Sequence, residues 1–423
     1  MTHEMADILK ILMMGGQRSG KSSMLAGLLE TMLNGKVKEL VTVEDMTARS
    51  GTGLDLSRNI RDLKLRLLMT QDKSFLIDDE NNKTNAFSDY LLEFAVPGTS
   101  SRMQMLFSDV NGEFYDKGQI HDTEISKLIR ECDVFLVAID TPFLMEAVNP
   151  SNRLCNESIN LSYNHVRDLE DFFTELDDKD GADAKLVIFV PLKCEKWIRE
   201  GQTARVVKRV EEVYGRIIHN LSAYTNVEID IMPIQTVGNI VFDEQRRALV
   251  CNSGGKQRRC CISPDKQYVR FEDGTVERID PAKHKFDEDN RAKIRENSTL
   301  IRPNSWFKTI GKEYAPQNCD QLAFYILQFY LAKVLFAQKV EDLQKKRTMW
   351  KYLKISATVL LWFAGGLFGG ILGYYTSNFL AKKFGTFTVD QMKALMDKIK
   401  AGGYIKSNCD GIKNIKPSKL YSL

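Results

Sequence analysis

A glycine-rich stretch near the start of the chain has the residue types and spacing of a loop that binds phosphate. It fits the pattern G-x-x-x-x-G-K-[ST], in which successive backbone N–H groups point inward toward phosphate oxygens. Lys21 then brings a positive, catalytic charge to the β- and γ-phosphates, and the Ser22 hydroxyl binds Mg²⁺. The candidate binding residues are Gly15, Gly16, Gln17, Arg18, Ser19, Gly20, Lys21, Ser22 and Ser23.

The residues on either side of this loop predict the elements that hold it. Residues 8–14 are an apolar run that predicts a strand, and residues 22–33 have helical spacing. A helix that begins at the loop adds its positive N-terminal dipole to the phosphate site. The alternative is a glycine turn between a core strand and a helix, with no ligand.

A second polar pattern, Asp109 and Gly112 in D-x-x-G, follows the strand-like run 102–108. An aspartate at a strand end can hold the Mg²⁺ shell, and a glycine three residues later can donate its N–H to a γ-phosphate. Turns often contain this spacing, so D-x-x-G indicates nucleotide binding only because a phosphate loop precedes it. Residues 88–96 and 102–110 flank the turn "PGTSS" and predict an antiparallel hairpin at the edge of a sheet.

Further apolar runs complete the predicted sheet. Residues 133–140 and 185–192 have the continuous apolar character of strands buried on both faces, and 227–234 predicts another strand. Helical spacing near 122–131 and 160–177 lies between them. This alternation predicts an α/β fold: a six-stranded, mainly parallel sheet with helices on both faces.

The order of these motifs resembles the Ras-like (TRAFAC-class) P-loop GTPases, in the branch that includes translation-factor, dynamin-like and bacterial conflict-associated GTPases. The resemblance covers residues 7–240 and a helix near 319–337. It implies GTP and GDP as ligands and Mg²⁺ as cofactor, with Ser22, Asp109 and Thr84 at the metal. Thr70 is the rival to Thr84 as the threonine of the first switch.

The resemblance also assigns a base-binding site after the fifth and sixth strands. Lys193 packs along the base, and Glu195 accepts hydrogen bonds from guanine N1–H and the 2-amino group. The loop of Thr236, Val237 and Gly238 contacts the base through backbone N–H groups. The family motif is N/T-K-x-D, so Leu192 and Glu195 depart from it. ATP stays open as the alternative nucleotide, and a surface ion pair is the alternative role of Lys193 and Glu195.

Hydrolysis is expected to be slow. The residue after D-x-x-G is often a glutamine that orients water, and here it is Glu113. A carboxylate there adds negative charge beside the γ-phosphate, where the transition state requires the opposite. We therefore expect turnover that accelerates on self-association or with an unidentified protein partner. Arg18 is a source of positive charge within the loop, although an arginine pointing to solvent is the simpler interpretation.

Residues 240–310 interrupt the resemblance to the GTPase domain, which spans 1–337. Within them, 267–279 alternates by twos around Asp273-Gly274 and predicts a β-hairpin. Mixed charges without interleaved aromatic residues favour a protein contact over a nucleic-acid site, as does the formal net charge of +3 for the whole chain. The adjacent Cys260-Cys261 pair raises a metal or redox site as a minor alternative, because no second ligand pair lies at zinc spacing.

The C-terminal part predicts a membrane segment. Residues 355–381 are an uncharged run of 27 residues, about 40 Å as a helix against a hydrocarbon core of about 30 Å. Gly365, Gly369 and Gly373 put small residues on one helix face, which favours self-association in lipid. We expect a basic stalk at 338–354 and a basic tail at 382–423. A re-entrant hairpin and a buried soluble helix are the alternatives.

The sequence thus predicts a membrane-anchored GTP-binding switch or self-assembling GTPase that forms homo-oligomers and spans the membrane once. Its GTPase domain lies in the cytoplasm to meet nucleotide, and the side on which its tail lies stays open because both flanks are basic. Two other functions stay open. One is a nucleotide-gated membrane-disrupting effector of a bacterial conflict system, and the other is a nucleotide-binding scaffold without turnover.

Overall fold

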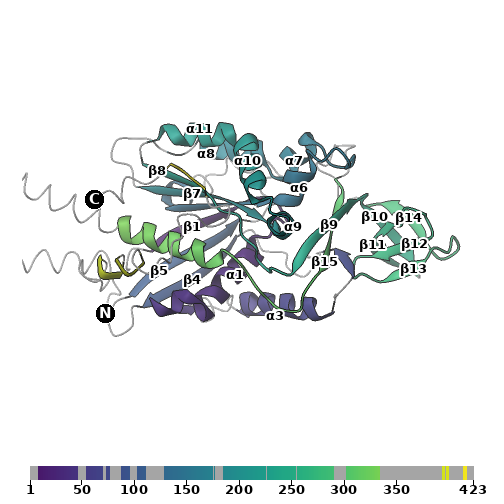
Figure 1. The fold of residues 1–423 in the computed structure, drawn as a ribbon, viewed down its shortest axis with the longest axis horizontal. Coiled ribbons are helices and arrows are strands. Elements are labelled where there is room, and N and C mark those ends of the chain that lie inside the picture. The colour runs from purple at the N-terminus through teal and green to yellow at the C-terminus, as the bar shows by residue number, and fades with distance from the viewer. Residues whose placement is uncertain are drawn as a thin grey trace, which may run out of the picture.

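The central element of the computed structural model is a sheet with the strand order β16-β8-β7-β6-β1-β5-β4-β2 in the part of the chain that the structure describes (Figure 1). That part comprises residues 8–45, 54–69, 73–76, 87–95, 102–110, 128–174, 176, 184–224, 226–253, 255–289, 302–333, 393–395, 397–399 and 413–416.

Five neighbouring strands of this sheet run parallel, as their continuous apolar sequences predict. Every residue of β6 and of β7 is buried, which leaves no face of either strand open to solvent. The parallel strands are β1 (Leu9–Met14), β5 (Arg102–Val110), β6 (Val134–Asp140), β7 (Lys185–Leu192) and β8 (Val227–Ile231).

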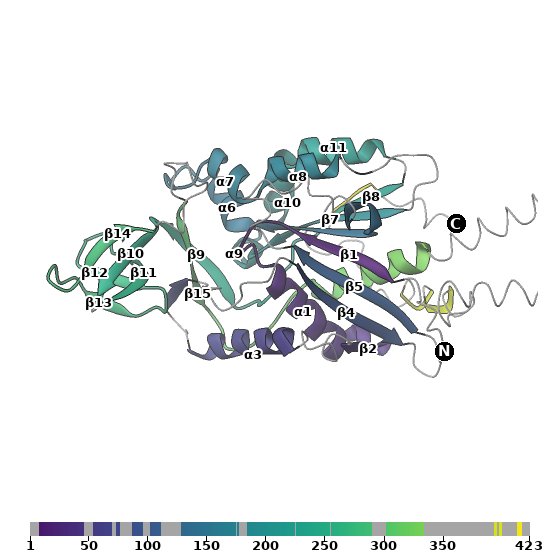
Figure 2. The same ribbon diagram turned by 180° about the vertical axis from the view of Figure 1, so that it is seen from behind.

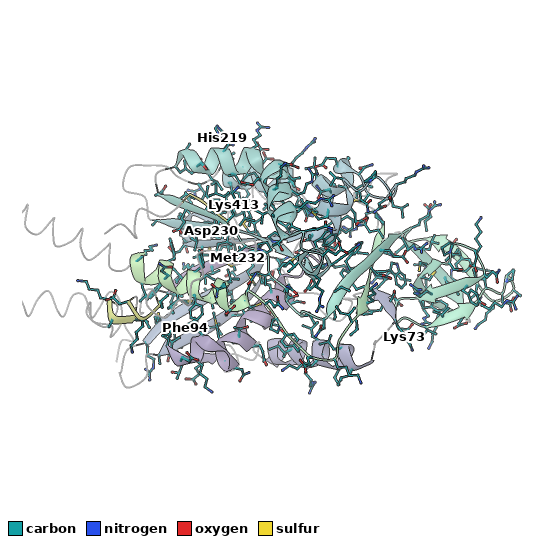
Figure 3. The ribbon with its side chains drawn as sticks, in the orientation of Figure 1. Lys73, Phe94, His219, Asp230, Met232 and Lys413 are labelled. Carbon is teal, nitrogen blue, oxygen red and sulfur yellow. The ribbon has the colours of Figure 1, made fainter. Side chains whose placement is uncertain are left out.

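Antiparallel strands extend the sheet on both sides. The expected hairpin forms, because β4 (Phe87–Ala95) pairs with β5 along its whole length. The hairpin is not the edge, however, since β2 (Thr42–Asp45) pairs with β4 outside it. At the opposite edge, β16 (Lys413–Lys416) pairs with β8, and Figure 3 labels Lys413 and Asp230 on these neighbouring strands. The prediction of six strands is therefore wrong: the described sheet has eight, because β2 and β16 are four-residue strands without an apolar run.

Helices cover both faces of the sheet, as predicted (Figures 1 and 2). One face packs against α1, α3 and a helix over residues 319–333, and the other packs against α8, α10 and α11. This is a mixed α/β domain with a largely parallel sheet, consistent with a GTPase-like fold. The described helices are α1 (Lys21–Asn34), η1 (Lys36–Glu39), α3 (Leu54–Met69), α6 (Thr141–Glu146), α7 (Glu157–Tyr163), α8 (Val166–Phe173), α9 (Glu195–Arg199), α10 (Thr203–Val213) and α11 (Gly215–Ala223).

Two further sheets lie at one end of the molecule, and most of their strands come from the described residues between 240 and 309 (Figure 1). One sheet has the order β3-β15-β9, and the other has the order β13-β12-β11-β10-β14. The predicted hairpin forms between β12 and β13, with Gly274 at φ 85° in its turn. The strands are β3 (Ser74–Leu76), β9 (Ile240–Arg246), β10 (Leu249–Ser253), β11 (Lys256–Ile262), β12 (Tyr268–Phe271), β13 (Val276–Arg278), β14 (Lys285–Glu288) and β15 (Asn304–Thr309).

The adjacent cysteines of β11 belong to two different hydrophobic clusters. Cys260 packs with Phe271, and Cys261 packs with Trp306, because successive residues of a strand face opposite sides. Burial raises the pKa of Cys261 to about 11. Within the described residues, no group of three or more histidine, cysteine, aspartate or glutamate side chains is arranged to hold a metal ion.

Several predicted features lie outside the described residues. Thr84, Gly112 and Glu113 are among them, as are the stalk at 338–354 and the apolar run at 355–381. Among the helices that the structure does describe, none combines the length and the apolar character needed to cross a bilayer.

Candidate functional site

The glycine-rich loop joins the end of β1 to the start of α1, as predicted. Gly15 has φ 134° and Gly20 has φ 108°, conformations that a side chain rarely permits. A Cβ on Gly15 would also lie 2.4 Å from the carbonyl oxygen of Ala138 in β6. Both glycines are therefore required by the backbone path that turns strand into helix.

The loop's carbonyl groups are held by side-chain donors. Lys21 Nζ donates to Gly15 O at 2.9 Å and to Gly16 O at 3.1 Å. Tyr163 Oη donates to Gln17 O at 3.0 Å, and Lys193 Nζ donates to Arg18 O. In a trans peptide the C=O and the next N–H point in opposite directions. These contacts therefore turn the N–H groups of residues 16–18 away from the donors.

Lys193 connects the loop to the neighbouring strands. Its Nζ lies 2.7 Å from Asp140 Oδ2, and the side chain of Asp140 is almost fully buried at the end of β6. Asp140 also accepts from Phe143 N at the start of α6. The sequence analysis missed Asp140, although the signal was present: it is an aspartate at the carboxyl end of a buried strand, as Asp109 is.

Tyr163, at the end of helix α7, makes a second contact to the loop that was not predicted from the sequence. Tyr163 ends this helix, and its ring stacks on Phe143 at 3.7 Å between centroids. The guanidinium of Arg302, just before β15, lies 4.7 Å from the centre of the same ring. A Cβ on Gly16 would lie 2.5 Å from Tyr163 O, so the end of α7 packs directly against the loop.

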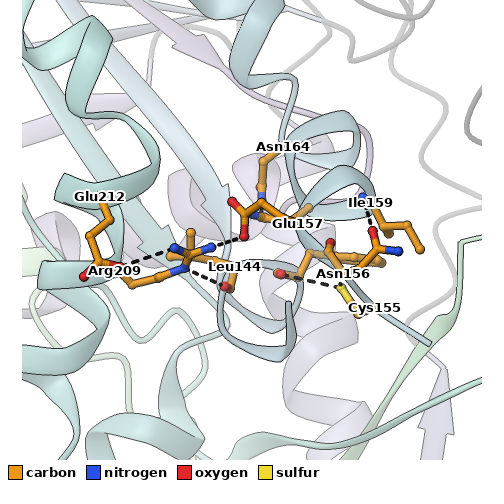
Figure 4. Close-up of polar contacts among 10 residues, drawn as sticks. Leu144, Cys155, Asn156, Glu157, Ile159, Asn164, Arg209 and Glu212 are labelled. Carbon is orange, nitrogen blue, oxygen red and sulfur yellow. Dashed lines mark hydrogen bonds and ion pairs between the residues drawn. The ribbon is translucent and has the colours of Figure 1, made fainter. Parts of the chain in front are cut away.

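Polar contacts at the other end of α7 fix its position (Figure 4). Asn156 caps the helix by accepting from Ile159 N at 3.0 Å. Arg209 of α10 pairs with Glu157 and donates to Leu144 O at 3.5 Å, which ties α10 to α7 and α6. Tyr163, whose side chain contacts the phosphate loop, is thus held in place by contacts among α6, α7 and α10.

Ser22 and Asp109 meet beside the loop. Ser22 Oγ donates to Asp109 Oδ2 at 3.3 Å. Asp109 is 2 % exposed, and its Oδ1 has no hydrogen-bond partner among the described residues. Burial raises the pKa of this carboxyl, while Lys21 and Ser22 oppose the rise. A hydroxyl next to a buried carboxylate with a spare oxygen fits the ligand set of Mg²⁺, which usually keeps waters and substrate phosphates as its other ligands.

Glu195 begins α9 and turns its carboxyl inward. It is 2 % exposed, and burial raises its pKa to about 7. Backbone N–H groups of Val237, Gly238, Thr236 and Glu195 itself donate to the carboxyl and oppose the rise. The carboxyl and the loop after β8 therefore lie together, as the resemblance implies for a base-binding site.

Leu192 has a packing role at the position where the family motif has a polar residue. A Cβ on Gly20 would lie 3.5 Å from Leu192 Cδ1 and 3.9 Å from the Lys193 Cε. The leucine side chain thus lies against the phosphate loop. This contact explains why an apolar residue is accepted here.

The structure brings together most of the predicted site. Asp109 lies at the carboxyl end of β5, and the loop 15–23, Lys193, Glu195 and the segment 236–238 follow the carboxyl ends of β1, β7 and β8. In parallel sheets these ends share one edge, where such folds bind ligands. Thr84, Gly112 and Glu113 are not placed, because they lie outside the described residues.

Comparisons with known proteins find weak structural similarity. No family model and no curated protein matches the chain. Among solved structures, the GTPase-like domain of S. cerevisiae Ski7 matches it in two crystal structures, one bound to GTP and one bound to GDP and inorganic phosphate. Each match has 10% sequence identity and a TM-score of 0.30, and covers 72% of this chain and 76% of that chain. The functional assignment therefore rests on the site's own geometry.

Proposed function

We propose that the chain binds a guanine nucleotide with Mg²⁺ at this site and hydrolyses GTP slowly. The observation that carries the proposal is Lys193. It joins the phosphate loop to Asp140 and stands two residues before Glu195, whose carboxyl meets the segment 236–238. The side chain of Lys193 thus contacts the phosphate loop, while its backbone leads directly to the residue proposed to bind the base.

The phosphates would be held by several positive groups acting together. These are the inward N–H groups of residues 16–18, the Lys21 ammonium and the N-terminal dipole of α1. When bound, Mg²⁺ would neutralise phosphate charge, and Ser22 and Asp109 would hold it. To reach a phosphate, Lys21 Nζ would exchange its contacts with Gly15 O and Gly16 O for phosphate oxygens.

The base would be selected by Glu195. An ionised carboxylate offers two acceptors, which match the N1–H and 2-amino donors of guanine. Adenine has an acceptor at N1, so it cannot form the hydrogen bond that guanine N1–H would donate to the carboxylate, a loss of about 1.5–3 kcal/mol. ATP is the alternative ligand because Glu195 is one methylene longer than the family's aspartate.

For hydrolysis we propose that Thr84 completes the metal site, that Gly112 contacts the γ-phosphate, and that Glu113 is the residue nearest the attacking water. A carboxylate at Glu113 would hold turnover low. We also propose membrane association through residues 355–381 and self-association through their repeated glycines. A nucleotide switch on a membrane is the function that unites these features.

The first test is calorimetric titration of the full chain, in detergent, with non-hydrolysable GTP and ATP analogues in Mg²⁺. We call the described part of residues 8–333 the head. The full chain is used because β16 and the buried Leu395 and Ile399 belong to the head's sheet and core. We expect tight binding of the GTP analogue and at least tenfold weaker binding of the ATP analogue. Equal or stronger ATP binding would refute the guanine assignment while leaving the phosphate site intact.

Phosphate release from the same protein tests turnover. We expect slow GTP hydrolysis that increases with protein concentration on vesicles and increases further in Glu113→Gln. No release under any of these conditions would favour the non-hydrolysing scaffold. Nucleotide-dependent leakage of a dye from vesicles, lost in Gly369→Leu, would favour the membrane-disrupting effector instead.

A further inference from the structure

The tail of the chain belongs to the same folded body as the head. Strand β16 pairs with β8 in the register Lys413↔Ile231, Asn414↔Asp230 and Lys416↔Ile229. Ile415 packs against the core of that sheet face, and Lys413 forms an ion pair with Glu211 of α10. The tail thus provides the edge strand that covers β8.

A second contact joins the tail to the head's other face. Leu395 is 3 % exposed and Ile399 is 0 % exposed, and both belong to the hydrophobic cluster that contains Phe324 and Phe329 of the helix 319–333. The chain therefore leaves this cluster after residue 333 and has returned to it by residue 395. In Figures 1 and 2 the green helix 319–333 and the yellow segment 393–399 lie at the same end of the molecule, opposite the sheet of β10 to β14.

From these contacts we propose that head and tail lie on the same side of the membrane, and that residues 355–381 enter and leave the bilayer through one face. This inference rests on the membrane association proposed above and changes its topology. It replaces the single-pass arrangement that the sequence predicts, because one crossing would place β16 across the bilayer from β8.

The length of the apolar run decides how the chain returns. A shared side requires an even number of crossings, and two helical crossings need about 40 apolar residues. The uncharged run has 27. Divided into two arms, it gives about 20 Å for each as helix, less than the hydrocarbon thickness of about 30 Å. The run is therefore too short for two helical crossings, and the shared side favours a return through one face of the bilayer.

The sequence of the run suits a reversal near its middle. The pairs Gly365-Gly366 and Gly369-Gly370 lie on either side of its midpoint, and glycine permits the backbone conformations that tight turns require. Backbone groups at such a turn need partners inside the membrane. Self-association through the same small residues would bury them, which connects the topology to the proposed oligomer.

Charge on the two flanks agrees with a shared side. Residues 338–354 carry six lysine and arginine side chains against two acidic ones, and residues 382–423 carry nine lysines against three aspartates. Basic segments favour the cytoplasmic side of a membrane and are attracted to its anionic lipids. A single crossing would place one basic flank on the unfavoured side, whereas a return on one face places both on the favoured side.

The test is protease protection of the full chain, with different epitope tags at its two ends, in sealed vesicles of phosphatidylcholine and phosphatidylserine. In vesicles whose N-terminal tag is digested, we expect the C-terminal tag to be digested equally without detergent. Protection of the C-terminal tag until detergent is added would overturn the proposed topology but would not contradict membrane association through residues 355–381. Failure to float with the vesicles would refute the membrane association and the topology together. Nucleotide titration is independent of all three results.

A cross-link tests the tail's position in the membrane-bound protein. Lys413→Cys with Glu211→Cys, in a Cys409→Ser background, should cross-link with a short bis-maleimide in the floated fraction. Lys413→Cys with Glu200→Cys is the matched control, because Glu200 lies before the start of α10, far from Glu211. Cross-linking no greater than in the control would overturn the proposal.

Discussion

The carboxyl ends of the parallel strands and the β16 edge of the same sheet are built from different interactions. At the strand ends, charged groups are buried: Lys21 is 7 % exposed, and Asp109 and Glu195 are each 2 % exposed. Around β16 and residues 393–399, contact is made by apolar side chains and by strand pairing. Burying charge costs free energy that pairing or hydrogen bonding must offset, whereas burying apolar area stabilises the fold directly.

This difference separates binding from stability. Substitutions at the strand ends should change nucleotide affinity and leave the fold largely intact. Substitutions where the tail meets the head should lower the free energy of unfolding and leave the affinity of the folded protein unchanged. Each prediction below tests one side of this separation, in order of expected effect.

Lys21→Ala should reduce affinity for the GTP analogue by at least about 100-fold, or about 2.8 kcal/mol. It removes the ammonium that now contacts Gly15 O and Gly16 O. Titration calorimetry measures the loss. Lys64→Ala is the matched control, because Lys64 makes an exposed ion pair with Glu30 on the neighbouring helix and should leave affinity unchanged. Unchanged affinity in Lys21→Ala would contradict a phosphate role for the loop.

Ile399→Ala should lower the free energy of unfolding by about 2 kcal/mol, because it removes a fully buried side chain from the cluster where tail meets head. Denaturant titration in detergent measures the change. Lys398→Ala, at the exposed neighbouring position, is the control. If Ile399→Ala were as stable as the wild type, the tail would not contribute to the core, and the contrast between the two regions would fail.

Guanine-nucleotide affinity should fall about tenfold between pH 8 and pH 6 through Glu195. Its pKa is raised to about 7 by burial, and each pH unit below the pKa reduces the ionised fraction about tenfold. In the free protein the carboxyl holds its proton between about pH 4.5 and 7, where the unfolded chain has lost it, so this group lowers stability as pH rises through that window. Glu195→Gln is the control, because it retains the nucleotide's own titration. Identical profiles for the two proteins would contradict the assignment.

Tyr163→Phe should weaken affinity about fivefold, close to 1 kcal/mol, since it removes one hydrogen bond to Gln17 O and keeps the ring that stacks on Phe143. Tyr268→Phe on β12 is a matched control at a half-exposed ring. Equal affinities would show that the loop keeps its shape without this contact, and would limit the preorganised part of the site to Lys21 and Lys193.

The parts of the site that could be predicted from the sequence were those whose chemistry depends on near neighbours in the chain. The spacing from Gly15 to Ser22 specified the loop, and the apolar runs specified β1, β6 and β7. Asp140 and Tyr163 were missed because their partners, Lys193 and Gln17, lie 53 and 146 residues away. Strands β2 and β16 were missed because four residues with a single apolar side chain show no period, and only the open edges of β4 and β8 make them strands.

The sequence by itself determined the phosphate loop, the parallel core of the sheet, the hairpin around Gly274 and the presence of a long uncharged run. Each follows from local spacing, where residue type sets backbone preference or burial directly. Only the tertiary structure decided that Lys193 reaches Arg18 O, that Glu195 meets the segment 236–238, and that the tail returns to the head. Those contacts depend on which distant segments the packed sheet brings to the same edge, and no local pattern records that choice.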